Sequence, residues 1–536
     1  MENNKDLIEM KKYLIGVAPR QYQEEIFLTA INNNTLVVLP TGLGKTLVAL
    51  MLSINRMIKF PKSKILFLAP TRPLAEQHYH YFIKYLPELF ADFILFTGKI
   101  QPEKRKKEWQ PANIIFSTPQ CIANDVKNNL YDLDDVSLLI EDECHRCTKN
   151  YAYTYIAKKY KEQSENFRIL GLTASPGSEK ENIKRICKSL EIEKVEVRKR
   201  ESEDVKEYLQ ELKFEIIKLD FPVELAKLRD TLKIIYDKKV GELINRKLLF
   251  GRPTKKTLLE AQHRIMRAIS TGNRNFNILS GASACAIAVK IHHALELIET
   301  QTLASTFEYI QGLFEQARQG KSKAVQQIIK SSEFNQAYNY LIELIAKKQE
   351  HPKLKKLEEM IINEMKIKKS MKIMVFAQYR DTVVKICKDL NSIPGINAKA
   401  FVGQAIKGET GMNQKEQQEL IREFSAGKIN VLVSTSIGEE GLDIPEVDAV
   451  IFYEPIPSAI RSIQRAGRTA RLCPGKLIIL LTKKTRDESY YWAAFYKEKK
   501  MYKAMDDIGE EMNNQIDSNK KQKEIFEYSD NEGEIE

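Results

Sequence analysis

The sequence is poor in cysteine and has no long apolar run. Its seven cysteines are scattered, and only Cys144 and Cys147 are spaced as C-x-x-C, without the second pair that a zinc cage needs. The most apolar helical segment, residues 282–289, is short and is followed by Lys290, so we expect no membrane span, which needs about 20 apolar residues. The N-terminus lacks the apolar core of a secretory signal. These absences favour a soluble cytoplasmic protein with free thiols.

Positive charge is in excess. The 536 residues include 84 lysines and arginines against 72 aspartates and glutamates, which gives a net charge of +12 and an isoelectric point near 9.0. A polyanionic partner is the natural inference, although charge carries weight only beside motifs that place it. The length predicts three or four domains, and a hydrophobic content of 43% is typical of a globular chain.

Two regions of the chain alternate short apolar runs with amphipathic segments. In residues 1–220 the runs are TLVVLP, KILFLAP, FILFTG, NIIFSTP, SLLIEDE and RILGLTAS; in residues 350–500 they are KIMVFAQYR, INVLVSTS, AVIFYEP and KLIILLT. Each run is apolar and ends in small or polar residues, as buried parallel strands do when helices cover both faces of a sheet. We therefore predict an α/β fold with two doubly wound parallel-sheet lobes, whose ligands bind beyond the carboxyl ends of the strands.

The remaining regions have a different character. Residues 221–349 place apolar side chains at helical spacing, as at Leu225, Leu228 and Leu232, which predicts an all-helical insertion between the lobes. Its basic residues form either a solvated helix face or a nucleic-acid grip, and the neighbouring motifs favour the second interpretation. Those residues are Arg246, Lys247, Arg252, Lys255, Lys256, Arg264 and Arg267. Residues 501–536 are predicted to form a helical extension and a disordered acidic tail.

A phosphate-binding loop follows the first apolar run. The strand TLVVLP leads into TGLGKT and then into a helical segment, so that backbone N–H groups and a helix N-terminus face the same point. Lys45 supplies a point charge to the β- and γ-phosphates, and Thr46 offers a hydroxyl to Mg²⁺. Leu39 replaces the first glycine of the general pattern but leaves its GKT end intact. The predicted loop consists of Leu39, Pro40, Thr41, Gly42, Leu43, Gly44, Lys45 and Thr46.

Two acidic residues end the run SLLIEDE. Asp142 stands at the end of a buried strand, where a P-loop ATPase places the acidic residue that holds Mg²⁺. Glu143 follows directly and is positioned to accept a proton from the attacking water. A solvated turn could also carry paired acids. Their place after four apolar residues and downstream of the P-loop favours the catalytic interpretation.

Three arginines in SIQRAGRTAR recur at every third position: Arg465, Arg468 and Arg471. On a helix they would share a face. Such a cluster can stabilise the charge on a transferring phosphoryl group, although a basic surface helix is the simpler interpretation of the segment alone. Because the segment belongs to the second lobe, the site would be completed only when the lobes close, which would couple ATP turnover to motion.

The set and order of the motifs resemble those of the superfamily-two DEAD/DEAH-type helicases. The motifs are PRQYQEE, LPTGLGKT, APTRPLAEQ, STPQ, DECH, TAS, VFAQYR, FVGQ, STSIGEEGLDIPEVD and QRAGRTAR. DECH, IHHALELIETQ in the insertion, YEPIPSAIRSIQRAGRTAR and TRDESYYW narrow the resemblance to the archaeal Hef and eukaryotic FANCM helicases. The resemblance covers the chain to about Met501 and implies two RecA-like lobes that hydrolyse ATP with Mg²⁺.

The resemblance also implies roles for single residues. Arg20 and Gln23 would contact the adenine, and His145, Thr173 and Ser175 would couple the ATP and nucleic-acid sites. Further ATP contacts are implied for Gly441, Asp443, Gln464, Arg468 and Arg471. In QRAGRTAR the usual second glycine is Ala470. The implied nucleic-acid track, made of residues suited to phosphate and sugar contact, consists of Thr71, Arg72, Thr97, Gly98, Thr118, Pro119, Gln378, Arg380, Gly403, Gln404 and Thr435.

The leading functional hypothesis is a DNA-dependent ATPase that translocates on and remodels forked or branched DNA in replication-fork repair. The first alternative is an RNA helicase or duplex-RNA translocase, because RIG-I-like sensors and Dicer share the insertion. A nucleic-acid sensor usually has further domains, and an inactive scaffold would have lost Lys45, Asp142, Glu143 or Arg468. We expect no nuclease in this chain and, where one is needed, a separate polypeptide. QKEIFEY, residues 522–528, is only faintly similar to a sliding-clamp-binding peptide.

Overall fold

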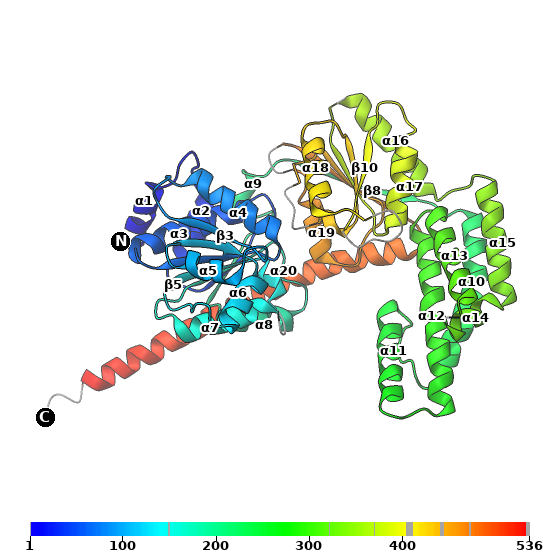
Figure 1. Ribbon diagram of the computed structural model, residues 1–536, viewed down its shortest axis with the longest axis horizontal. Coiled ribbons are helices and arrows are strands. Elements are labelled where there is room, and N and C mark those ends of the chain that lie inside the picture. The colour runs from blue at the N-terminus through cyan, green and yellow to red at the C-terminus, as the bar shows by residue number, and fades with distance from the viewer. Residues whose placement is uncertain are drawn as a thin grey trace.

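The computed structural model contains two α/β lobes with a helical bundle inserted between them in the sequence (Figure 1). It describes residues 2–147, 151–320, 322–368, 370–403, 411–439, 444–470 and 473–531, and the side chains from residue 4 to residue 512 within those ranges. The two parallel sheets and the intervening bundle confirm the predicted fold class.

In the described residues the sheet of the first lobe has seven parallel strands in the order β3-β4-β2-β5-β6-β1-β7. Successive side chains of a strand point to opposite faces, so Leu36 and Val38 pack with α6, α7 and α8, whereas Val37 packs with α2, α3 and α4. The strands are β1 (Thr35–Val38), β2 (Lys64–Leu68), β3 (Phe93–Phe96), β4 (Ile114–Ser117), β5 (Val136–Asp142), β6 (Ile169–Thr173) and β7 (Lys194–Val197). The helices are α1 (Glu2–Lys11), α2 (Gln21–Ala30), α3 (Lys45–Lys59), α4 (Arg72–Tyr85), α5 (Pro102–Trp109), α6 (Pro119–Lys127), η1 (Cys144–Arg146), α7 (Ala152–Gln163), α8 (Lys180–Ser189) and α9 (Glu203–Lys206).

The sheet of the second lobe has six described parallel strands in the order β10-β11-β9-β12-β13-β8. Its strands are β8 (Leu212–Leu219), β9 (Ile373–Phe376), β10 (Ala398–Phe401), β11 (Val431–Ser434), β12 (Ala449–Phe452) and β13 (Gly475–Thr482). Its helices are α16 (Pro352–Ile367), α17 (Arg380–Leu390), α18 (Gln414–Ser425), η2 (Ser436–Gly438) and α19 (Ala459–Ala466). The lobe boundary predicted at residue 220 is wrong by one strand, because β8 pairs along its whole length with β13.

The insertion is a bundle of α10 (Val223–Asn245), α11 (Lys255–Ser270), α12 (Phe276–Thr300), α13 (Leu303–Arg318), α14 (Lys323–Ile329) and α15 (Ser332–Ala346). The expectation that no apolar segment reaches membrane-spanning length is wrong for α12, which continues through Lys290. By length and composition α12 could cross a membrane, with a mean hydropathy of 1.4 over its most apolar window. Half of that window is buried inside the structure, where α12 packs against α10 and α11 as the central helix of the bundle.

Buried polar contacts attach the bundle to the second lobe. The Lys353 ammonium of α16 lies 2.8 Å from the Asp487 carboxylate and donates a hydrogen bond of 2.7 Å to the Thr300 carbonyl at the end of α12. Thr382 of α17 donates a hydrogen bond of 2.8 Å to the Gln301 side chain. The Lys353 and Asp487 side chains are both fully buried. These buried contacts therefore fix the bundle to the second lobe.

Breaking this buried ion pair should destabilise the protein. We expect Lys353→Ala to lower the free energy of unfolding by about 3–5 kcal/mol, because it leaves the Asp487 charge buried without its partner. Replacing both residues, with Lys353→Met and Asp487→Leu, should cost less than the single change, since no uncompensated charge of the pair remains and only the Thr482 N–H and the Thr300 carbonyl lose a partner. A urea titration of the three proteins checks this. A single variant as stable as the unchanged protein would contradict the assigned role of the pair.

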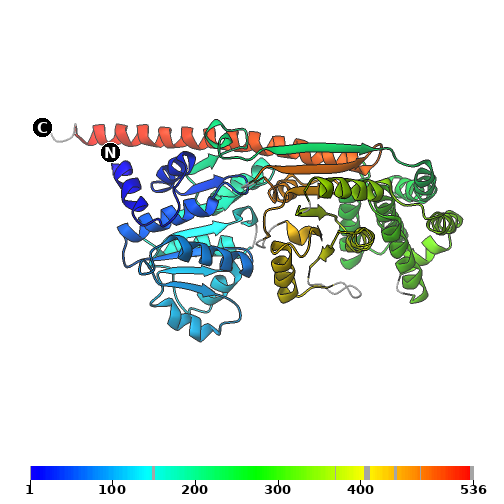
Figure 2. The ribbon, with the colours of Figure 1, turned by 90° about the horizontal axis from the view of Figure 1, so that it is seen from above.

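A single long helix, α20 (Arg486–Asn531), crosses both lobes (Figure 2). It starts beside the bundle, where the Tyr490 hydroxyl donates to Glu296 at 2.9 Å. It then runs along the second lobe, and its residues Met501, Met505 and Ile508 are buried in the core of the first lobe. The division predicted at residue 501 therefore falls inside one continuous helix. The described side chains end before QKEIFEY. Of the expected acidic tail YSDNEGEIE, residues 528–536, the first four residues belong to α20 and the rest lie outside the described residues.

Candidate functional site

The predicted phosphate-binding loop connects β1 to α3 at the carboxyl edge of the first sheet. Gly42 and Gly44 have φ angles of 90° and 74°, the left-handed region that glycine adopts without strain. The Lys45 ammonium, from the first residue of α3, donates a hydrogen bond of 3.0 Å to the Leu39 carbonyl. The amine therefore lies over the loop, and the loop and helix N-terminus have the arrangement that cradles phosphates.

Residues at the start of α2 form hydrogen bonds with this loop. The Gln23 amide and the Tyr22 hydroxyl both donate to the Leu43 carbonyl, at 3.0 and 2.8 Å. A Cβ atom on Gly44 would lie 2.4 Å from the Gln23 amide nitrogen, so only glycine fits there. The Arg20 guanidinium stacks on the Tyr208 ring at 4.9 Å. The adenine contacts predicted for Arg20 and Gln23 stay a prediction, while the structure gives Gln23 a role in holding the loop.

Asp142 and Glu143 lie beside the loop, where β5 ends. Burial alone would raise the pKa of Asp142, but the hydrogen bond with His78 and the Lys45 charge outweigh it and hold that pKa below its usual value. Glu143 has a φ of 51°, an uncommon left-handed conformation of the kind that gathers at functional sites. Glu141, which the sequence did not single out, is fully buried, and burial raises its pKa well above the usual range.

The three residues predicted to couple the two sites are next to one another. The His145 Nδ1 lies 3.3 Å from the Glu143 carboxylate and 3.2 Å from the Thr173 hydroxyl. The Ser175 backbone N–H donates to the Thr173 hydroxyl at 3.1 Å. His145 is therefore hydrogen-bonded to Thr173 at the end of β6 and lies at ion-pair distance from Glu143.

The sequence reasoning missed His78 of α4, which touches both predicted metal ligands. Its Nε2 lies 2.9 Å from the Asp142 carboxylate, and its Nδ1 lies 3.4 Å from the Thr46 hydroxyl. The buried stripe of α4 consists of Ala75, His78 and Phe82, so helical periodicity could have placed this histidine inside. Thr46 and Asp142 thus converge on one point with a hydroxyl and an ionised carboxylate, oxygen ligands of the kind that Mg²⁺ takes.

The arginine segment differs from its prediction. α19 ends at Ala466, so Arg468 lies beyond the helix and does not share a helical face with Arg465. Arg465 is fully buried, lies over the rings of Phe376 and Phe452 at 4.9 and 5.5 Å, and is paired with Glu439 at 2.8 Å. Glu439, also missed, accepts two hydrogen bonds of 2.7 Å from Arg461, and its carbonyl accepts one of 2.8 Å from Arg468.

Four predicted site residues of the second lobe lie outside the described ranges: Gln404, Gly441, Asp443 and Arg471. Gln464 is described and is buried in α19. Ala470 has a φ of 54°, in the left-handed region that glycine adopts without strain.

The two lobes meet at the ATP side of the site. A Cβ atom on Gly467 would lie 2.6 Å from the Thr41 hydroxyl, so the segment before Arg468 touches the phosphate-binding loop. A cavity of about 410 Å³ opens beside this contact and is lined by residues of both lobes and of α20, among them Pro40, Ile463 and Phe495. The arginine segment is therefore placed to complete the phosphate site from the second lobe.

The predicted nucleic-acid track lies on the same edge of the two sheets. Thr71 and Thr118 precede α4 and α6, Pro119 starts α6, and Thr97 and Gly98 follow β3. In the second lobe, Gln378 follows β9, Thr435 follows β11, and Arg380 donates to the Gly403 carbonyl at 3.0 Å. A cavity of about 450 Å³ joins the lobes here. Its lining adds residues that the sequence reasoning missed: Glu76, Lys99, Asn413, Gln414, Lys415 and Gln418, beside Arg72 and Pro73.

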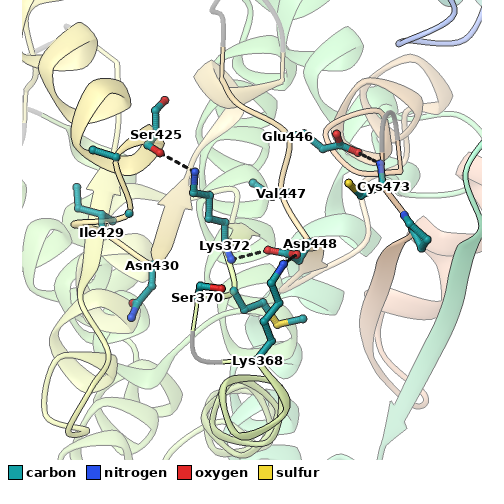
Figure 3. A pocket seen from close by; sticks show the side chains of 14 residues that line it. Lys368, Ser370, Lys372, Ser425, Ile429, Asn430, Glu446, Val447, Asp448 and Cys473 are labelled. Atoms are coloured by element: carbon teal, nitrogen blue, oxygen red, sulfur yellow. Dashed lines mark hydrogen bonds and ion pairs between the residues drawn. The ribbon is translucent and has the colours of Figure 1, made fainter.

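A further cavity of about 480 Å³ lies at the opposite edge of the second sheet (Figure 3). Lys368 and Lys372 hold the Asp448 carboxylate there, by an ion pair of 2.6 Å and a backbone hydrogen bond of 2.7 Å. The residues that line it directly precede β9, β11 and β12, so the cavity lies at the amino ends of these strands. Doubly wound sheets bind ligands at the carboxyl ends of their strands. This cavity is therefore separate from the candidate site.

The fold and the site define a two-lobed helicase-type ATPase. Three family models match in succession: "Type III restriction enzyme, res subunit" over residues 16–178, "Putative ATP-dependent RNA helicase, helical bundle" over residues 224–351, and "Helicase conserved C-terminal domain" over residues 352–473. The crystal structure of the Pyrococcus furiosus Hef helicase domain is 43% identical, with a TM-score of 0.68, and the match covers 89% of this chain and 98% of that one. The chain belongs to the superfamily-two helicases, in the group of the Hef helicase domain, as its motifs predicted.

Two curated relatives extend the comparison. A protein of Methanocaldococcus jannaschii, named "Putative ATP-dependent RNA helicase", is 40% identical over 490 residues, which cover 90% of this chain and 60% of the relative. An ATP-dependent DNA helicase of Sclerotinia sclerotiorum is 34% identical over 495 residues, which cover 88% of this chain and 40% of the relative. The chain thus spans about half the length of these relatives, and the match concerns their helicase region.

Proposed function

We propose that this protein is an ATP-driven translocase that remodels forked or branched DNA, with the insertion bundle as its grip on the duplex. The proposal rests on the free end of the bundle. There α11 and the adjoining ends of α10 and α12 project away from the lobes (Figure 1). The Arg246 guanidinium lies over the exposed Phe276 ring at 5.8 Å, and Arg264 lies over the exposed Phe250 ring at 5.9 Å. Arg264 is exposed, whereas Arg246 is half-buried and paired with Glu242 at 3.1 Å. Arginines beside exposed aromatic rings suit phosphate contact and base stacking.

The joint between the bundle and the second lobe supports a mechanical role. Because the Lys353–Asp487 pair and the Thr382–Gln301 bond are buried, the bundle would move with the second lobe when the lobes close on ATP. DNA held by the bundle would then be displaced relative to a strand held in the interlobe cavity beside Arg72 and Lys415. Closure of the lobes would in this way become movement along DNA.

The chemistry follows from the residues around the loop. Lys45 and the loop N–H groups would bind the phosphates, and Glu143 would take the proton of the attacking water. Arg468 would reach the γ-phosphate from the second lobe. Mg²⁺, held by Thr46 and Asp142, would neutralise charge on the β- and γ-phosphates. His145, at ion-pair distance from the Glu143 carboxylate and hydrogen-bonded to Thr173, would connect the two residues.

The choice of DNA is supported by the name of the Sclerotinia relative, whereas the name of the Methanocaldococcus relative favours RNA. Contacts to the backbone alone do not separate the two. The deciding experiment compares ATPase stimulation by forked DNA, plain duplex DNA, single strands and double-stranded RNA at one fixed salt concentration. Strongest stimulation by forked DNA is expected, and strongest stimulation by double-stranded RNA would replace the proposal with the RNA alternative.

Removing charge from the free end of the bundle should weaken fork binding. Arg264 and Arg267 of α11 are both exposed there, and we expect the double Arg→Ala variant to lower the slope of log K against log salt by about 0.9 for each phosphate that it no longer neutralises. A matched control, Lys323→Ala with Lys330→Ala, removes two exposed lysines elsewhere on the bundle. Fluorescence anisotropy with forked DNA at several salt concentrations measures both slopes. Equal slopes for the two double variants would contradict the grip.

A further inference from the structure

His78 makes the same contacts that a metal-orienting residue would make. The imidazole is buried, with 7% of the residue exposed, and its ring lies against the Phe67 ring of β2 at 4.4 Å between centroids. One ring nitrogen meets the Asp142 carboxylate at 2.9 Å, and the other meets the Thr46 hydroxyl at 3.4 Å. Packing on Phe67 fixes the plane of the ring, so that both nitrogens are aimed by the fold.

The chemistry of the carboxylate fixes the direction of the first hydrogen bond. An ionised carboxylate can only accept, so the His78 Nε2 carries the hydrogen and donates it to Asp142. In the tautomer that leaves Nδ1 without a hydrogen, Nδ1 accepts the hydrogen of the Thr46 hydroxyl, and the lone pairs of the Thr46 oxygen remain available. The backbone N–H of Glu143 also stabilises the ionised Asp142 carboxylate.

Other contacts hold the backbone of Asp142. The Tyr153 hydroxyl donates to the Asp142 carbonyl at 2.6 Å and lies 3.3 Å from the Leu68 carbonyl. The strand end is therefore anchored independently of His78. His78 additionally fixes the rotation of the Asp142 carboxylate about its side-chain bonds and the direction of the Thr46 hydroxyl.

We propose that His78 is a positioning residue that orients both protein ligands of the Mg²⁺ accompanying ATP, Thr46 and Asp142, through its two ring nitrogens. The proposal rests on the ATPase part of the proposed function and does not depend on the choice between DNA and RNA. Residues that hold metal ligands by hydrogen bonds typically contribute about 10- to 100-fold to metal affinity. His78 is expected to act within this range.

The test measures how much Mg²⁺ strengthens nucleotide binding. The affinity for a fluorescent ADP is determined with Mg²⁺ and with EDTA, and the ratio of the two dissociation constants is compared among variants. His78→Leu should lose about 10- to 100-fold of the Mg²⁺-dependent gain and keep its affinity in EDTA. His78→Gln should retain most of the gain, because its amide can donate to Asp142 while its carbonyl accepts from Thr46.

Two further variants keep the result unambiguous. His80→Leu removes an exposed histidine from the same helix and should leave the ratio unchanged. His78→Asn retains a polar amide that is too short to reach both partners, so it should lose the gain even if the leucine variant folds poorly. A gain that survives in both His78→Leu and His78→Asn would overturn the proposal, as would an equal loss of affinity in EDTA. Failure of the unchanged protein to bind ADP would instead overturn the ATP site itself.

Discussion

Replacing Arg468 with alanine should lower the turnover number for ATP by about 10³- to 10⁵-fold, the range that an arginine finger contributes. Gly467 touches Thr41 of the phosphate-binding loop, so the next residue enters the site from the second lobe. The Arg468 guanidinium is held by the Glu439 carbonyl at 2.8 Å, which places a fixed charge next to the loop. Because this charge acts on the transition state, nucleotide affinity should change far less than turnover.

Arg461→Ala is the matched control for this variant. Arg461 lies in the same segment and pairs with the same glutamate, but its side chain is one-third exposed and it is not predicted to reach ATP. Steady-state kinetics and nucleotide affinity are measured for both proteins. A loss of turnover in Arg461→Ala as large as in Arg468→Ala would show that the segment acts only through its folding. Normal turnover in Arg468→Ala would remove Arg468 from the active site.

Ten of the thirteen described strands were predictable, because a strand buried on both faces has a continuous apolar sequence, whereas β7, β8 and β10 were not predicted. A parallel strand covered on both faces must be apolar throughout, and each predicted run, from TLVVLP to KLIILLT, forms a strand. β8 escaped prediction because it is an edge strand with polar residues among its apolar ones, and Phe214 in it is half exposed. Its long connection from β7 gives no sign of the lobe it joins, so the domain boundary was misplaced.

The helical extension was predicted from residue 501, but its earlier start and its packing on the first lobe were not. Beyond residue 501 the sequence is rich in charge, which is typical of a fraying end. Among the described side chains there, Met501, Ala504, Met505 and Ile508 share one helical face and are buried against the lobe formed by the other end of the chain. Lys180 and Lys199 of the first lobe add ion pairs to Asp507 and Asp506 of α20. Such long-range partners cannot be read from local composition.

In the candidate site, motifs identified the residues that would touch ATP but not those that hold them. Lys45, Asp142 and Glu143 stand out because phosphate and proton chemistry demand particular residue types at strand ends. His78 and Glu439 act through other side chains, and any residue with suitable donors or acceptors could fill such a role. Only their distances to Asp142 and to the arginines reveal them.

Glu143→Gln is expected to lower the turnover number by about 10²- to 10⁴-fold, because glutamine cannot accept the proton of the attacking water. The side chains are nearly the same size, so the left-handed backbone at this residue and the neighbouring Asp142 should be undisturbed. The variant should therefore bind ATP and stay in the closed, ATP-bound state with the lobes in contact. Lys45→Ala, which removes a phosphate ligand, should lose both turnover and tight ATP binding and so serves as the contrasting variant.

The trapped state gives this prediction a readout besides activity. Binding of forked DNA to Glu143→Gln should become tighter when ATP is added and should stay tight for many turnover times of the unchanged protein, because the clamp formed by the lobes cannot reopen without hydrolysis. Lys45→Ala should show no such response. A filter-binding time course after addition of ATP follows both. If Glu143→Gln hydrolyses ATP at the normal rate, the proton must leave through another group. The position of His145, 3.3 Å from that carboxylate, would then make His145 the next residue to replace.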